Sequence, residues 1–196
     1  MSAVPPGEVD LPASASEDRA RALNRFLASV ELKAFRIAQL TLRNEDDALD
    51  VVQDAMLQLA RAYAARPEEE WKPLFYRILE NRIRDMQRRR LVRGRVIAWL
   101  PFRQQDDEDE LPDPIERAAS PDPLPGHQLQ MDEALSALDR AIQTLPKRQR
   151  QAFLLRTLEG MDVAQTAAAM GCSEGSVKTH YFRALQTLRS QLGDYW

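Results

Sequence analysis

The sequence has little of what most enzymes and secreted proteins depend on. Its 196 residues include one cysteine, two histidines and seven glycines. A single cysteine excludes a disulfide scaffold and a multi-cysteine zinc site. No Gly-rich phosphate loop and no Ser-His-Asp set is evident, and two distant histidines offer catalysis few candidates. We therefore expect no enzymatic activity, no cofactor, no metal ion and no small-molecule substrate.

Long hydrophobic runs are also missing. The first ten residues, MSAVPPGEVD, contain neither a basic start nor an apolar run, so they do not form a signal peptide. The longest uncharged stretch elsewhere, 163–173, is too short to span a bilayer. These absences predict a cytoplasmic protein without direct membrane insertion.

Charge, in contrast, is abundant and unevenly distributed. The chain has 27 Lys and Arg against 30 Asp and Glu, a net charge of −3. Residues 71–95 hold nine basic and two acidic groups, whereas residues 104–133 hold one basic and ten acidic groups. Residues 140–196 hold eight basic and four acidic groups. Local fields steer binding more than net charge does, so each basic segment is a candidate nucleic-acid footprint.

The acidic segment coincides with a change in composition. Residues 101–126 contain six of the 12 prolines and the acidic run 106–110, a composition that cannot bury a core. We therefore expect four parts, which are a flexible N-terminus (1–16), a first domain (17–100), an acidic Pro-rich linker (101–130) and a second domain (131–196).

Both domains are predicted to be helical, which makes the fold class all-α. Apolar residues recur at helical spacing, and neither strand-like alternation nor Gly-based hairpin turns occur. Asn44 is expected to cap the second helix, and Pro67 with the run 68–70 to end it. Pro73 suits the first turn of a third helix. Four helices are expected in the second domain, at 132–144, 147–159, 162–170 and 174–191.

The last two of these helices have the pattern of a helix-turn-helix. Gly171 supplies the left-handed conformation that ends the first helix, and Ser173 can cap the second. Val177 would pack beneath the turn. The second helix would expose Ser176, Lys178, Thr179, His180, Phe182 and Arg183, which are side chains suited to a major groove. The alternative is an ordinary αα-hairpin with a glycine C-cap.

The sequence around this motif resembles a known family. Residues 145–161, with the continuation 171–184, strongly resemble region four of bacterial sigma factors. Residues 46–56 and 76–90 resemble the polymerase-binding and promoter-melting helices of sigma region two. Two such motifs in this order, joined by a linker and without an intermediate domain, point to the extracytoplasmic-function (ECF) group.

The resemblance implies partners and roles. It implies binding to the clamp helices of the largest subunit of core RNA polymerase, through Asp50, Gln53, Asp54 and Leu57. It implies contacts with the minus-ten promoter element through Lys72, Arg77, Asn81, Arg84 and Arg88. Contacts with the minus-thirty-five element are implied for Ser176, Lys178, Thr179, Phe182 and Arg183. An anti-sigma factor is a further implied partner, and it could hold the chain at the membrane.

Some features depart from the family pattern or leave alternatives open. Trp71 stands where Phe is common, Leu74 where an aromatic residue is frequent, and His180 where Arg is frequent. The acidic run of the linker could mimic RNA in the polymerase, or it could fold back on the basic helix of the first domain. Two rival functions are a conventional regulator that binds duplex DNA without polymerase, and a protein-binding module with a degenerate helix-turn-helix.

Overall fold

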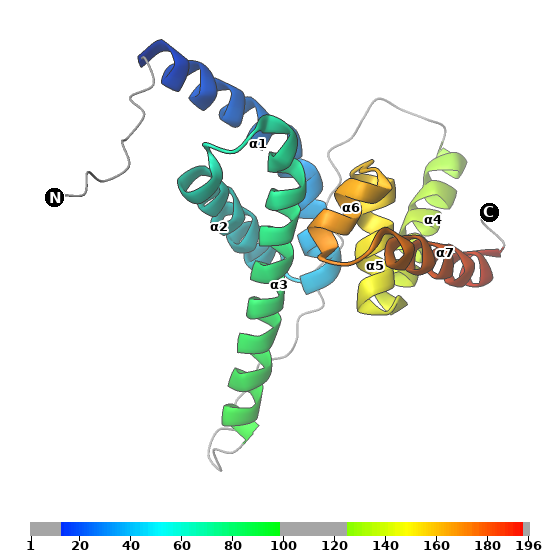
Figure 1. Cartoon of the computed structure of the whole chain (residues 1–196). Helices are drawn as coiled ribbons and strands as arrows, with labels where there is room; N and C mark the ends of the chain where they lie inside the picture. The colour runs from blue at the N-terminus through cyan, green and yellow to red at the C-terminus, as the bar shows by residue number, and fades with distance from the viewer. Residues whose placement is uncertain (1–12, 99–124, 194–196) are drawn as a thin grey trace, which may run out of the picture.

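The computed structural model describes residues 13–98 and 125–193, and within these ranges it contains helices and turns but no strand (Figure 1). The predicted all-α fold is therefore confirmed. The expected flexible N-terminus and the linker fall mainly outside the described residues. The elements are α1 (Ala13–Leu42), α2 (Glu45–Tyr63), α3 (Glu68–Ala98), α4 (Pro125–Thr144), α5 (Lys147–Phe153), the π-helical turn η1 (Leu154–Leu158), α6 (Val163–Met170) and α7 (Glu174–Gln191).

Helices α1, α2 and α3 pack around a shared apolar core, here called the first unit. The predicted cap of α2 is confirmed, since the Asn44 side chain accepts a hydrogen bond of 2.8 Å from the Asp47 amide. Aromatic rings fill the centre, where Phe26 lies 5.8 Å from Trp71 and 6.2 Å from Phe75 between ring centroids. Trp71 is 1% exposed. Trp71, which stands where Phe is common in the family, therefore packs in the core, and its ring is not available to DNA.

Helix α3 begins earlier than predicted. Residues 68–70, expected to be a loop, form its first turn, and Pro73 lies inside the helix. Three glutamates in a first turn are favourable because they face the positive end of the helix dipole. Pro73 is the sixth residue of α3 and not in its first turn as predicted, so it removes the donor that would bond to the Glu69 carbonyl. The C-terminal half of α3 extends beyond the other helices (Figure 1).

Helices α4 to α7 form the second unit, which contains the predicted helix-turn-helix. Asp162 caps α6 in a reciprocal pair with Gln165. Gly171 ends α6 with φ of 61°, and the Ser173 side chain caps α7. Val177 is 1% exposed beneath the turn. These observations confirm the motif.

Two boundaries in the second unit differ from the prediction. Helix α4 begins at Pro125 and not at 132. The expected helix 147–159 changes after α5 into η1, whose wider turn is closed by the Glu159 amide donating to the Leu154 carbonyl at 3.2 Å. Gly160 then reverses the chain with φ of 70°. Simple 3.6-residue periodicity does not reveal such an inserted turn.

The two units are in contact. Helix α6 lies beside α3 (Figure 1), and α4 contacts α1, where Arg36 and Asp139 form an ion pair of 2.5 Å. Among the described helices, none is long and apolar enough to cross a membrane.

Candidate nucleic-acid interface

The basic stripe of α3 is the first candidate interface. Four of the residues predicted to contact the minus-ten element recur at three- or four-residue spacing on one face of this helix, namely Arg77, Asn81, Arg84 and Arg88. Lys72, five residues before Arg77, lies off that face. Arg77, Asn81 and Arg88 are exposed, whereas Lys72 and Arg84 are half-buried. The helix therefore presents guanidinium groups and one side-chain amide along a single path.

Other arginines of α3 have partners inside the first unit. Arg82 donates to the Gln58 side chain at 3.0 Å and lies 3.8 Å from Asp54. Arg90 pairs with Asp47 and donates to the Leu42 carbonyl at 3.1 Å. These contacts fasten α3 to α2 and to the end of α1. A count of basic residues along the helix therefore overstates the charge directed at a nucleic acid.

The stripe on α3 faces the second unit. Arg77, Asn81 and Arg84 line a polar cleft of about 230 Å³ whose opposite wall includes Arg148 and Gly171. Arg148 is held there by a hydrogen bond of 2.9 Å to the Met170 carbonyl. The structure thus brings three of the predicted minus-ten residues next to the turn of the helix-turn-helix.

Lys72, the fourth of these residues, contacts the second unit directly. Its Nζ lies 2.7 Å from the Glu159 carboxylate and donates to the Glu159 carbonyl at 3.1 Å. The Tyr76 hydroxyl donates to the other carboxylate oxygen at 2.6 Å. Burial, and then the hydrogen bond and charge of Glu159, raise the pKa of Tyr76 far above its ordinary value.

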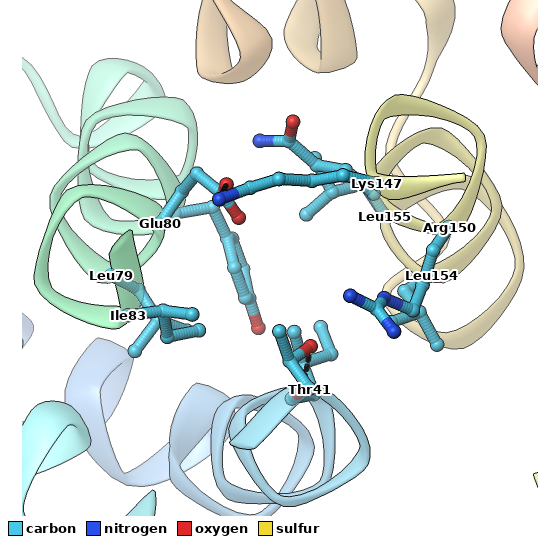
Figure 2. Close-up of a pocket in the computed structure, with 11 residues that line it drawn as sticks. Thr41, Leu79, Glu80, Ile83, Lys147, Arg150, Leu154 and Leu155 are labelled. Atoms are coloured by element: carbon cyan, nitrogen blue, oxygen red, sulfur yellow. Dashed lines mark hydrogen bonds and ion pairs between the residues drawn. The ribbon is translucent and has the colours of Figure 1, made fainter. Parts of the chain in front are cut away.

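A small cavity lies beside this contact, between α1, α3 and α5 (Figure 2). Its volume is about 20 Å³, room for about one water molecule. Figure 2 shows Lys147 reaching across it toward Glu80, with a distance of 3.6 Å between the charged atoms. On the same side as Lys147, burial lowers the pKa of the Arg150 guanidinium, while Glu80 opposes the shift. The junction therefore combines apolar side chains with ionic groups.

Helix α7 is the second candidate interface. Val177, Ala184 and Leu188 are buried and anchor one face of the helix in the second unit. Lys178, Thr179, Phe182 and Arg183 are exposed and Ser176 is half-buried, so the predicted minus-thirty-five residues lie mainly on the open side. Phe182 is 61% exposed. The ring lies beside the exposed Lys178 and Arg183, so it is available for contact with a partner.

Helix α2 presents a third surface. Asp50, Gln53 and Asp54 are exposed, and Leu57 is 50% exposed, as expected for a face that meets another protein. Leu49 is 44% exposed and lies two turns before Leu57 on the same side of the helix. Sequence reasoning missed Leu49, although its spacing of four from Gln53 and eight from Leu57 was a usable signal.

Tyr76 and Glu159 were also missed as functional candidates. Tyr76 fits the apolar stripe of α3. Glu159 lies in the stretch 145–161, which resembles sigma region four without pointing to a role for this carboxylate. Nothing local in the sequence indicates that they meet. Across the described ranges, no group of three His, Cys, Asp or Glu side chains is arranged to hold a metal ion.

Family models match both units of the chain. Residues 26–92 match the family model for Sigma-70 region 2, and residues 135–188 match the model for Sigma-70, region 4. The first match covers α2 and most of α3, and the second covers the helix-turn-helix.

Individual relatives agree with the family models. The chain is 32% identical over 159 residues to the ECF RNA polymerase sigma factor SigM of Mycobacterium tuberculosis, covering 81% of this chain and 70% of that protein. It is 28% identical over 164 residues to the ECF RNA polymerase sigma factor SigE of Mycolicibacterium smegmatis, covering 83% of this chain but only 58% of that longer protein.

A solved structure shows the same fold. It is the sigma factor RpoE in complex with the anti-sigma factor NepR from Bartonella quintana, with a TM-score of 0.57 and 20% identity over 94% of this chain and 100% of that chain. The two family models and the similarity to SigM together show that the chain belongs to the ECF RNA polymerase sigma factors.

Proposed function

We propose that this sigma factor binds core RNA polymerase in the cytoplasm and directs it to promoters by reading two separate DNA elements. The observation that carries the proposal is the presence, in one chain, of a basic helix in the region 2 match and an exposed recognition helix in the region 4 match. The residues assigned below are proposed to bind DNA and polymerase and to help separate the DNA strands, and none is assigned a catalytic role.

Helix α3 would bind the minus-ten element and hold its separated strand. Lys72, Arg77, Arg84 and Arg88 would neutralise phosphates, which supplies affinity through counterion release. Separating the strands costs a few kcal/mol per unstacked base. Asn81 would offset part of this cost, because an exposed side-chain amide carries both a donor and an acceptor for a base edge.

Helix α7 would read the minus-thirty-five element in the major groove. Lys178 and Arg183 are suited to guanine edges and phosphates, and Phe182 to the methyl group of thymine. Thr179 already uses its hydroxyl proton at the Gly175 carbonyl, at 2.9 Å, so its methyl group and a lone pair remain for DNA. Ser176 lies at the start of the helix, where it would contact a phosphate.

Helix α2 would bind the clamp helices of the largest polymerase subunit. Asp50, Gln53 and Asp54 form an acidic and polar strip beside Leu49 and Leu57. Exposed leucines surrounded by carboxylates suit a basic amphipathic helix, because burial of the leucines supplies affinity and the charges set orientation.

An anti-sigma factor is the further proposed partner. The RpoE structure contains such a protein, NepR. The fold of the present chain matches the RpoE structure over 100% of the matched chain. An anti-sigma factor would bind this chain by covering surfaces that polymerase or DNA otherwise uses.

Run-off transcription with purified core polymerase tests the proposal. We expect transcripts from cognate bacterial promoter DNA when this chain is added to core, and none from core alone. A chain that binds promoter duplex tightly by itself but fails to bind core would instead favour a conventional DNA-binding regulator. Binding to core without transcription from any promoter would favour a protein-binding module.

A further inference from the structure

The polar cleft beside the turn of the helix-turn-helix is lined by more positive than negative groups. Three guanidinium groups line it, from Arg77 and Arg84 on α3 and from Arg148 on α5, together with one carboxylate, that of Glu80. Three cations against one anion leave an excess of two positive charges. Lys147, which lies 3.6 Å from the Glu80 carboxylate, adds a further cation next to the cleft.

Protein groups neutralise these cations only in part. Arg84 and Lys147 approach Glu80 at 3.7 Å and 3.6 Å, which is longer than a hydrogen bond. The Glu80 Oε1 atom is buried and accepts no hydrogen bond within the described ranges. The Arg77 guanidinium is exposed and makes no hydrogen bond or ion pair with the described part of the chain. The cleft therefore offers donors and positive charge that an anion could use.

Arg148 is fixed in place by the second unit. Its Nη1 atom donates to the Met170 carbonyl at 2.9 Å and to the side chain of Gln151 at 3.3 Å. Gln151 is itself only 8% exposed. Both bonds use the same terminal nitrogen, so the other N–H groups of this guanidinium remain available. A cation that is already held by its neighbours loses little conformational freedom when a ligand binds.

The size and chemistry of the cleft select a small phosphate ligand. Its volume of about 230 Å³ is room for about eight water molecules, at roughly 30 Å³ each. A guanidinium group presents paired N–H donors that match the oxygens of a phosphate two at a time. A single carboxylate would leave part of the positive charge unpaired, whereas two linked phosphates carry enough charge and enough oxygens for three arginines.

We propose that the cleft is a binding site for a diphosphate group, either as the free inorganic anion or as part of a nucleotide. Arg77, Arg84 and Arg148 would contact the phosphate oxygens, and the side-chain amide of Asn81 would add a donor. Glu80 would oppose binding by its charge. The site takes residues from both units, whereas the proposed minus-ten contacts come from α3 alone. Binding of diphosphate does not depend on the proposed function.

Isothermal titration calorimetry of the full chain with inorganic diphosphate tests the site. We expect saturable binding of one diphosphate per chain. Arg148→Gln and Arg77→Gln should each weaken binding by about tenfold or more, because each removes a charge-assisted hydrogen bond. Arg148→Lys should give an intermediate loss, since it keeps the charge but not the paired donors. Arg61→Gln, an exposed position on α2 outside the cleft, is the matched control and should change nothing.

Glu80→Gln supplies a change of opposite sign. Removing the one carboxylate of the cleft should raise the affinity for diphosphate by about threefold, because a like charge no longer faces the ligand. A variant that only damaged the fold would lower the affinity and could not raise it. Circular dichroism identifies any variant that fails to fold, and the comparison of Arg148→Lys with Arg148→Gln then carries the test.

Titrations with adenosine diphosphate and with adenosine distinguish the two sources of the diphosphate group. Tighter binding of adenosine diphosphate than of inorganic diphosphate would assign the site to a nucleotide, and equal or weaker binding would assign it to the free anion.

Four results would overturn the proposal. They are no saturable binding of either diphosphate by wild type, an equal loss in Arg61→Gln, a loss confined to Arg77→Gln, and adenosine binding as tightly as adenosine diphosphate. None of these titrations includes polymerase or promoter DNA, so run-off transcription decides the proposed function separately.

Discussion

The Tyr76 hydroxyl donates a hydrogen bond of 2.6 Å to the Glu159 carboxylate, across the contact between the two units. The two residues are 83 positions apart in the sequence, and they belong to different units. Tyr76 lies on α3, the helix proposed to open DNA, and Glu159 lies just before the helix-turn-helix. Their contact ties the two proposed DNA-binding surfaces to one conformational equilibrium.

The Tyr76 contact predicts a dependence on alkaline pH. The pKa of Tyr76 is raised while the two units are in contact, so the protonated hydroxyl is favoured in that arrangement. The hydroxyl therefore stabilises the contact between the units fully below the ordinary tyrosine pKa of about 10. Stabilisation is lost as the pH rises above this value, because the solvated tyrosine then ionises more readily. Small-angle X-ray scattering should therefore show the wild-type chain expanding above about pH 10, and a wild-type curve identical to that of Tyr76→Phe would contradict the prediction.

Leu57 on α2 is predicted to carry affinity for core polymerase. Leu57→Asp should weaken binding to core by tenfold or more, on the order of 1.4 kcal/mol or above, because an exposed leucine buried at an interface would be replaced by a charge. Leu32→Asp on α1 is the matched control, since Leu32 is 78% exposed and lies outside the α2 strip. Fluorescence anisotropy with labelled chain measures both, and equal losses would refute the assignment.

Asn81 is predicted to act in strand separation more than in initial docking. Asn81→Ala in the holoenzyme should slow open-complex formation while leaving closed-complex affinity nearly unchanged, because a base edge becomes available only after unstacking. Asn24→Ala, an exposed asparagine on α1, serves as the control. Stopped-flow fluorescence of a labelled promoter resolves the two steps, and an equal loss in both would argue against base capture.

Gly171 is predicted to be required for its backbone conformation. Its φ of 61° is unfavourable for residues with a Cβ, although a Cβ there would meet nothing within 4 Å. Gly171→Ala should therefore cost on the order of 1 kcal/mol of folding stability. Gly175→Ala, inside α7, should be neutral or stabilising. Thermal denaturation compares them, and equal melting temperatures would contradict this explanation.

Phe182 is predicted to contribute to promoter recognition and not to folding. Because its ring is 61% exposed, Phe182→Ala should leave the melting temperature nearly unchanged. The same variant should weaken holoenzyme binding to promoters with an intact minus-thirty-five element. A promoter in which that element is replaced supplies the control, and an equal loss on both promoters would remove Phe182 from the reading surface.

Local features were predictable from the sequence because their causes are local. The caps at Asn44, Asp162 and Ser173, the left-handed Gly171 and the buried Val177 each follow from a few neighbouring residues. Hydrophobic periodicity likewise predicted the all-α fold. The resemblance to sigma factors predicted region two before region four along the chain, and the family models match in this order.

Other features depend on contacts between distant residues or on competing local effects. The turn at residues 68–70 is helical because its acidic side chains favour the start of a helix more than Pro73 opposes it. Arg82 and Arg90 were counted with the DNA-binding charges, but partners on α2 and at the end of α1 engage them. The Tyr76–Glu159 contact depends on how the two units dock, which no local pattern encodes.

Permanganate reactivity of promoter thymines tests the central claim most directly. Core polymerase and this chain would be incubated together and separately with promoter DNA, and unpaired thymines in the minus-ten element would be detected by their oxidation. The account predicts reactive thymines only when both proteins are present, with reactivity reduced by Asn81→Ala. Unreactive thymines with core and wild-type chain together, on promoters that this chain occupies in complex with core, would contradict it.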